Sequence, residues 1–222
     1  MNLGDMVDIA IARVSGPSRA HVDVSAPFVV MSINDAMRRV ERAALWKFSE
    51  AEVTLEIEAG ERQATVASMP TDLAVPLLAY NLTTHTELAF HDDRQRVADQ
   101  TLTGDVLAYS VWGSELKFYP LPNRTNEVLL RYYRTWPALV NDGDEPVFPE
   151  TFHDMLTSYA AGQLILRLPP TEGKYLPQNA AEPHFAAFHA QLAEMLASDL
   201  VMPTFDRVSN HDHLEMLTDG EW

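Results

Sequence analysis

Residues 28–58 read FVVMSINDAMRRVERAALWKFSEAEVTLEIE, and the spacing of the apolar residues changes within this stretch. In its first part, apolar residues recur at every third or fourth position, which is typical of an amphipathic helix. From Val53 to Ile57 apolar and polar residues alternate, which is typical of a half-buried strand. We therefore predict a helix over residues 28–48 that leads directly into a β-sheet. This change determines the fold class.

Helical patterns lie at both ends of the chain, and strand patterns lie between them. The further helices are predicted over residues 3–14, 149–168 and 180–200. The apolar face of the last one is predicted to contain Phe185, Phe188, Leu192, Met195 and Leu196. Strands are predicted over residues 52–58, 63–68, 77–83, 86–90 and 128–133, with a helical turn over 94–99. Pro70 and Pro76 are predicted to lie in a loop.

Two local patterns make sharper predictions. Residues 106–119 predict a β-hairpin with Gly113 and Ser114 at its tip, because Gly followed by Ser suits a type II′ turn in which Gly takes a positive φ. Residues 160–162, Ala-Ala-Gly, are small enough to predict that another backbone comes close to the helix over 149–168.

Together these elements predict an α+β fold. We expect a helical body of two N-terminal and two C-terminal helices, an inserted antiparallel β-sheet domain and an extended C-terminal arm. The predicted limits are residues 1–48 and 147–202 for the helical body, 49–146 for the β domain and 203–222 for the arm. No long βαβ pattern is present, so a doubly wound nucleotide-binding fold is not expected.

The composition excludes several classes of site. The chain has 222 residues, a formal net charge of −16 and no Cys, which rules out disulfides, thiolate metal sites and Cys nucleophiles within it. A protein this acidic is not expected to bind nucleic acid through a basic surface or to bind anionic membranes. No apolar run is long enough to span a bilayer and no signal peptide is recognised, so we expect a soluble, intracellular protein.

No sequence motif indicates catalysis. Gly-rich phosphate loops, the nucleophile elbow and the His-Glu-x-x-His motif are all missing, so we predict no catalytic residue, no cofactor and no metal. His184 and His189 are five positions apart, which places them on different sides of a helix. His211, Asp212, His213 and Glu215 offer ligands to a divalent metal, but we favour a polar tail. Glu52, Glu56 and Glu58 are interpreted as an exposed strand face rather than as general acids or bases.

Two groups of residues leave alternatives open. The first is a basic face predicted on the helix over 28–48, formed by Arg38, Arg39, Arg42 and Lys47. It is either a solvated face with local ion pairs or a contact with the acidic surface of a neighbouring subunit. The second is an aromatic group, Tyr132, Tyr133 and Trp136, with Arg131 and Arg134. It either packs on a core, which we favour, or stacks on bases.

Three short motifs carry a resemblance to a known family. Residues 109–122 read YSVWGSELKFYPLP, residues 127–134 read EVLLRYYR and residues 147–156 read VFPETFHDML. This order resembles that of tailed-bacteriophage head-to-tail adaptor (connector) proteins, in which a Gly-and-Pro hairpin precedes a Tyr-ended strand and a helix opened by Pro and His-Asp. The helix opening at residues 3–6 and the helix end at residues 45–46 are also similar, and the resemblance covers most of residues 3–200.

The resemblance implies a structural protein without catalytic residues. It implies a homo-oligomeric ring, usually dodecameric, in the virion neck beneath the portal, assembled in the host cytoplasm. The implied partners are the portal and tail or nozzle proteins, with double-stranded DNA passing through the ring without sequence-specific binding. It also implies that the arm docks onto the portal, through residues that we assign as Pro203, Phe205, Arg207, Leu214, Met216, Leu217 and Trp222.

Two other functions remain open at this point. One is a neck or tail-completion protein that forms a ring elsewhere in the tail. The other is a virion-associated carbohydrate-binding or hydrolytic accessory protein that uses exposed aromatic residues such as Trp112 and Trp136.

Overall fold

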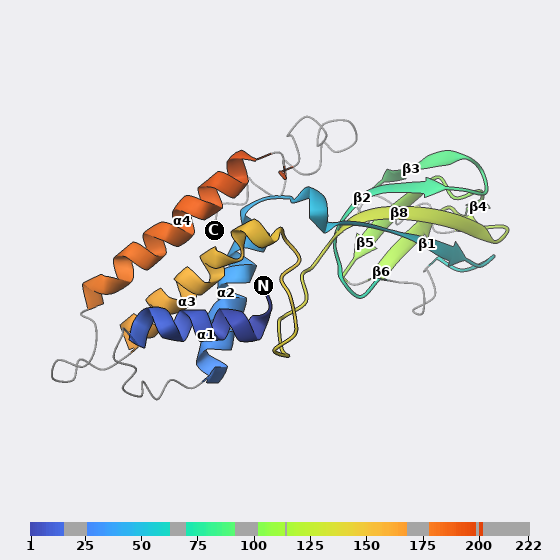
Figure 1. The fold of residues 1–222 in the computed structure, drawn as a ribbon. Coiled ribbons are helices and arrows are strands. Elements are labelled where there is room, and N and C mark those ends of the chain that lie inside the picture. Colours follow the sequence, from blue (N-terminus) through green and yellow to red (C-terminus); the bar gives the residue numbers. More distant parts are fainter. Residues whose placement is uncertain are drawn as a thin grey trace. The chain divides into compact units, whose positions relative to one another are not determined.

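The structure is a computed structural model with two compact units (Figure 1). It describes residues 1–15, 26–62, 70–91, 102–113, 115–167, 178–198 and 200–201. Met1–Ser49 and Trp136–Met202 form a helical unit, and Glu50–Thr135 form a β unit. The predicted α+β fold, a helical body with an inserted sheet, is confirmed. None of the described helices has the length and apolarity needed to cross a bilayer.

The helical unit is built around one central helix, α3. Its α-helices are α1 (Leu3–Ser15), α2 (Ala26–Ala43), α3 (Asp154–Arg167) and α4 (Glu182–Ala197). Short 3₁₀ helices are η1 (Lys47–Ser49), η4 (Glu150–Phe152) and η5 (Gln178–Ala181). Ten residues of α3 are buried, because α1, α2 and α4 all pack on it. Figure 1 shows α3 between α1 and α4.

The end of α2 differs from the prediction. The helix ends at Ala43 and not at residue 48, and Lys47 lies in η1. Burial of Trp46 explains the difference: its side chain is 1% exposed, and its indole N–H donates to the carbonyl of Val40 at 2.8 Å. The chain leaves the helix so that this large ring can enter the core. In α4, Leu196 was assigned to the apolar face, but it is 39% exposed, whereas Phe188 and Met195 on that face are buried.

The β unit contains one six-stranded sheet and a short two-stranded ladder. In the order of the sheet, the six strands are β1 (Glu50–Ile57), β8 (Asn126–Arg134), β2 (Leu73–Asn81), β3 (Thr86–Phe90), β5 (Ala108–Trp112) and β6 (Glu115–Tyr119). The ladder pairs β4 (Thr103–Gly104) with β7 (Leu121–Pro122). A second hydrophobic core, separate from that of the helices, includes Leu55, Ile57, Phe118, Val128 and Leu130.

The prediction of a purely antiparallel sheet is wrong. β3 pairs with β5 in parallel, and β4 pairs with β7 in parallel. Parallel neighbours need a crossover of a dozen or more residues, and residues 91–107, which link β3 to β5, are long enough to provide it. Sequence periodicity reports the strands themselves but not which of them become neighbours.

The predicted position of Pro76 is also wrong. It was predicted to lie in a loop, but it lies inside β2. The register between β2 and β8 shifts between Pro76 and Leu78, and Pro is tolerated in strands at such irregularities. The predicted strand over 63–68 and the helical turn over 94–99 lie outside the described residues.

The hairpin prediction is confirmed, and the close approach predicted at residues 160–162 is made by a side chain rather than by a backbone. β5 and β6 form an antiparallel hairpin in which Trp112 pairs with Glu115, and Gly113 has a φ of 60°. A Cβ atom at Gly162 would lie 2.8 Å from the Cε1 atom of Phe185, so α4 does approach α3 closely at this glycine.

Candidate interaction surface

The outward side of α2 is the most distinctive surface of the helical unit. Its inward side is apolar and buried, and consists of Val29, Ile33, Ala36, Met37 and Val40. The opposite side carries a row at helical spacing, formed by Met31, Asp35, Arg38 and Arg42. Met31 is 58% exposed, and Arg38 and Arg42 are also exposed. We call this row the α2 face.

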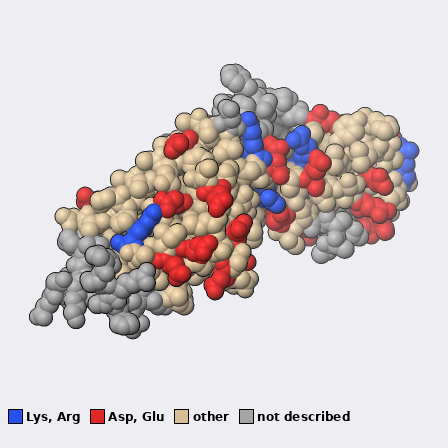
Figure 2. All heavy atoms as spheres, viewed as in Figure 1, with Lys and Arg blue, Asp and Glu red and all other residues tan. Residues whose placement is uncertain are grey.

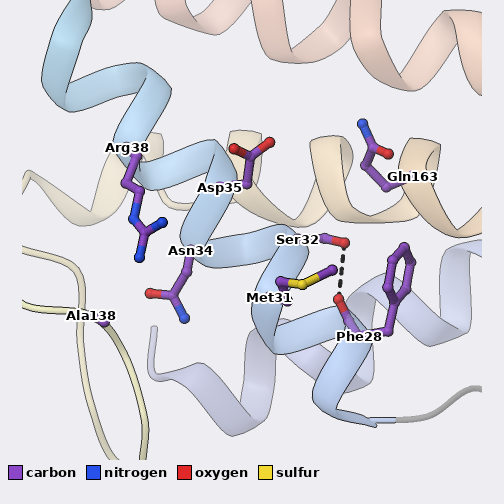
Figure 3. A pocket seen from close by; sticks show the side chains of 8 residues that line it. All are labelled: Phe28, Met31, Ser32, Asn34, Asp35, Arg38, Ala138 and Gln163. Carbon is purple, nitrogen blue, oxygen red and sulfur yellow. Dashed lines mark hydrogen bonds between the residues drawn. The ribbon is translucent and has the colours of Figure 1, made fainter.

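Two open hollows lie along the α2 face. The first has a volume of about 460 Å³ and is lined by Phe28, Met31, Ser32, Asn34, Asp35, Arg38, Ala138 and Gln163. Figure 3 shows Asn34 and Arg38 on the side of the chain segment that contains Ala138, and Asp35 on the side of Gln163 from α3. The second has a volume of about 470 Å³ and is lined by Asp35, Arg38, Arg39, Arg42 and Ala43. The two hollows share Asp35 and Arg38, and we call them together the α2 groove.

Asp35 links α2 to α3. Its Oδ2 atom accepts a hydrogen bond from the Tyr159 hydroxyl at 2.7 Å and one from Arg39 Nε at 3.1 Å. Gln163 donates to the Tyr159 oxygen at 3.1 Å, and the Arg39 guanidinium lies 5.2 Å from the centre of the Tyr159 ring. The hydrogen bond from Tyr159 is the main cause that lowers the pKa of Asp35, with Arg39 adding to it. Burial and the bond to Asp35 raise the pKa of Tyr159.

This network distinguishes Arg39, which is paired, from the other two arginines of α2 in the predicted basic face. Arg39 is paired with Asp35, and the pKa of Arg39 is raised by that bond. Arg38 and Arg42 make no hydrogen bond or ion pair with any described residue. Both charges are therefore available to an anionic partner.

The fourth residue of the predicted basic face lies elsewhere. Lys47 is exposed, but it is in η1, and its backbone N–H donates to the carbonyl of Leu200 at 2.8 Å. The neighbouring Trp46 forms a β-bridge with Val201. These contacts attach residues 200–201 to the segment that follows α2. The predicted arm residues, Pro203, Phe205, Arg207, Leu214, Met216, Leu217 and Trp222, lie outside the described residues.

The acidic strand face is located as predicted. Glu52, Glu56 and Glu58 are all exposed along and just after β1. Glu52 lies opposite Arg131 of β8, and Glu56 lies opposite Glu127. Exposed carboxylates of this kind give no buried group suited to acid–base catalysis.

The aromatic group belongs to the two cores, as the favoured prediction stated. Tyr132, Tyr133 and Trp136 are 5%, 3% and 8% exposed. Trp136 donates from Nε1 to Ser49 Oγ at 2.8 Å, and its ring lies 5.6 Å from that of Phe148. A buried ring has no face left for a sugar or a base, so the suggestion that Trp136 binds carbohydrate is wrong. The Trp112 side chain lies outside the described residues.

The histidines do not form a metal site in the described part of the chain. His184 is half-buried, and burial lowers its pKa, with the charge of Arg13 adding to the effect. His189 is exposed and lies edge-on against Phe188. No three His, Asp or Glu residues among those described come together. His211, Asp212, His213 and Glu215 lie outside the described residues.

Sequence reasoning missed two polar contacts, of which the first is half-buried and the second is buried. The first is the bond between Asp35 and Tyr159, for which the sequence gives no distinct signal, since α2 also contains the acidic residue Glu41. The second is His153, which is 3% exposed and lies between two backbone carbonyls, 2.8 Å from that of Phe148 and 3.2 Å from that of Met1. Its signal was the Phe-His-Asp sequence at residues 152–154.

Comparison with known proteins supports a structural role. No curated protein matches the chain. The model of a family described as SU10 adaptor protein matches residues 1–209. This match confirms the resemblance to head-to-tail adaptors, and the chain belongs to the SU10 adaptor protein family.

Proposed function

We propose that this phage adaptor, a structural protein, assembles into a closed ring that binds the portal in the virion neck and links the head to the tail. The ring is dodecameric and leaves a channel through which DNA passes. Its copies meet through the α2 face, and Lys47 adds a further cation to the contact. The arm over residues 203–222 docks onto the portal.

The observation that carries the proposal is the α2 face. Arg38 and Arg42 make no hydrogen bond or ion pair with a described residue, although the chain has a net charge of −16. On the side of the molecule seen in Figure 2, Asp and Glu cover more of the described surface than Lys and Arg do. Two unpaired cations on an acidic protein are suited to bind the acidic surface of another copy.

Ring closure and DNA passage are consistent with this charge distribution. A ring needs a heterologous contact, in which one surface of a copy binds a different surface of the next. A basic face and a predominantly acidic remainder meet that requirement. An acidic channel wall also avoids the release of counterions that makes basic surfaces bind DNA strongly.

A charge-reversal variant tests the proposal. We expect the chain mixed with portal to form rings that are visible in negative stain, and we expect R38E/R42E to lose them while its thermal unfolding is unchanged. The matched control is E52R/E56R, which reverses two exposed charges on β1 and should assemble normally. Wild-type protein that stays monomeric with and without portal contradicts the proposal.

A further inference from the structure

The outward side of α4 is shaped to receive another helix. α4 packs on α3 through its inward side, where Phe188 and Met195 are buried. The exposed side carries a row of alanines, Ala186, Ala190, Ala193 and Ala197. A row of small side chains lets the axis of a second helix come close. Leu196 beside this row is 39% exposed.

The charges of α4 are opposite to those of the α2 face. Its charged residues are Glu182 and Glu194, both exposed, and its sequence contains no Lys or Arg. α1 also exposes two carboxylates, Asp5 and Asp8, and its Arg13 is paired with Asp154, but its exposed side has no row of small residues. Among the described α-helices with an exposed acidic side, α4 therefore best complements Arg38 and Arg42.

The two rows also share their spacing. The α2 face has its members at positions 31, 35, 38 and 42, and the alanine row of α4 has its members at 186, 190, 193 and 197. Both follow the i, i+4, i+7, i+11 pattern of one helix side, which allows two helices to pack along their length. An exposed apolar residue accompanies each row, Met31 on α2 and Leu196 on α4.

Within one copy, α4 does not occupy the groove. Neither hollow along the α2 face is lined by an α4 residue. Both helices pack on α3, and Tyr159 of α3 contacts both of them, through Asp35 on α2 and the Phe188 ring on α4. The outward sides of α2 and α4 are therefore two different surfaces of the helical unit, as a head-to-tail contact requires.

We propose that α4 of one copy lies in the α2 groove of the next copy. In an antiparallel packing its alanine row then faces Met31, with Ala190 opposite it, and Glu182 reaches Arg38 and Arg42. This is the helix-in-groove mode of recognition, here used between copies of one chain. The inference rests on the proposed ring and names the surface that the α2 face binds.

Disulfide cross-linking tests this contact directly, because the chain contains no cysteine. We expect M31C/A190C, oxidised in the assembled ring, to give a ladder of covalent oligomers on a denaturing gel. Each single variant should remain monomeric, and an equal mixture of the two singles should give covalent dimers. The matched control is A12C/M31C, because Ala12 is exposed on α1 and belongs to neither row.

A charge swap provides the second test. R38E/R42E should lose assembly at physiological salt, and the additional change E182R should restore part of it. Assembly is restored only if the exchanged charges of α2 and α4 meet across the contact. A variant that is merely less stable would not regain assembly.

The possible outcomes separate this inference from the proposed function. Intact rings whose M31C/A190C form gives no ladder overturn the α4 contact and leave the ring. Covalent dimers of the single variant M31C would mean that the α2 faces of two copies meet across a two-fold axis, which also overturns the α4 contact. If duplex DNA binds the wild type but not R38E/R42E, the α2 groove binds DNA phosphates instead of α4, and the inference is overturned. If no ring forms at all, both the proposed function and the α4 contact are overturned.

Discussion

The Tyr159 hydroxyl of α3 donates a hydrogen bond to the Asp35 carboxylate of α2 across 2.7 Å, although the two residues are 124 positions apart in the sequence. This bond fixes the orientation of α2 on the central helix. It also holds Asp35 in its charged form, which keeps Arg39 paired and leaves Arg38 and Arg42 facing outward. One member of the α2 face, Asp35, is thus held by a contact with the central helix.

The first prediction concerns this bond. Replacing Tyr159 by Phe removes a hydrogen bond to a charged group, which is worth about 1.5–3 kcal/mol when shielded from water. The Asp35 side chain is 49% exposed, so solvent screening reduces the expected loss in the free energy of unfolding to about 1 kcal/mol. Urea unfolding monitored by circular dichroism measures it.

The effect of Y159F should depend on pH. The pKa of Asp35 is lower in the folded state than in the unfolded state. Ionised Asp35 therefore stabilises the fold above its unfolded-state pKa, and this stabilisation is lost as the pH falls through its folded-state pKa. The stability difference between wild type and Y159F should therefore shrink below about pH 4. A difference that grows in acid would show that Asp35 is not the partner that matters.

The second prediction tests the packing of α4 on α3. A Cβ atom at Gly162 already falls 2.8 Å from the Phe185 ring, so G162L must displace that ring and separate the helices. We expect a loss of about 2–3 kcal/mol and a clearly lower melting temperature. The control is G143A, where no atom lies within 4 Å of the added carbon. Equal melting temperatures for G162L and wild type would contradict the close approach.

The third prediction concerns the β unit. Asn81 is fully buried and donates to Oδ1 of Asn126, which is also fully buried, at 3.0 Å. Replacing Asn81 by Ala leaves that oxygen without its donor, at a cost of about 2 kcal/mol. Because the two units can unfold separately, amide hydrogen exchange is the suitable measurement. Amides of β2 and β8 should exchange faster while those of α3 do not change, and T54A, an exposed change on β1, should have no effect.

The fourth prediction concerns the arm. Deleting residues 203–222 should leave thermal unfolding unchanged and weaken co-sedimentation with portal. The helical unit keeps its last described contact, the bridge between Trp46 and Val201. A truncated chain that occupies the portal fully would refute the assigned role of the arm.

The sequence predicted the features that depend on local patterns. The α1 helix, the alternation in β1 and the hairpin around Gly113 each follow from spacing within a few residues. The end of α2 was wrong because burial of Trp46 overrides the local helical pattern. The parallel pairing of β3 with β5 was wrong because strand neighbours are chosen across the whole sheet.

Only part of the candidate surface was predicted, again because local patterns do not report contacts between distant residues. Charge along the chain indicated Arg38, Arg39 and Arg42, since helical spacing places them on one side. It did not separate Arg39 from the other two, because that distinction comes from Asp35 and Tyr159, which meet only in the folded state. Lys47 was grouped with them because the predicted helix was too long.

Native mass spectrometry of the chain, alone and mixed with its portal, tests the central claim most directly. The account predicts one closed oligomer with a fixed number of copies on the portal, stable at low salt and weakened as salt rises. A strictly monomeric chain in both samples, or open chains of variable length, would contradict it.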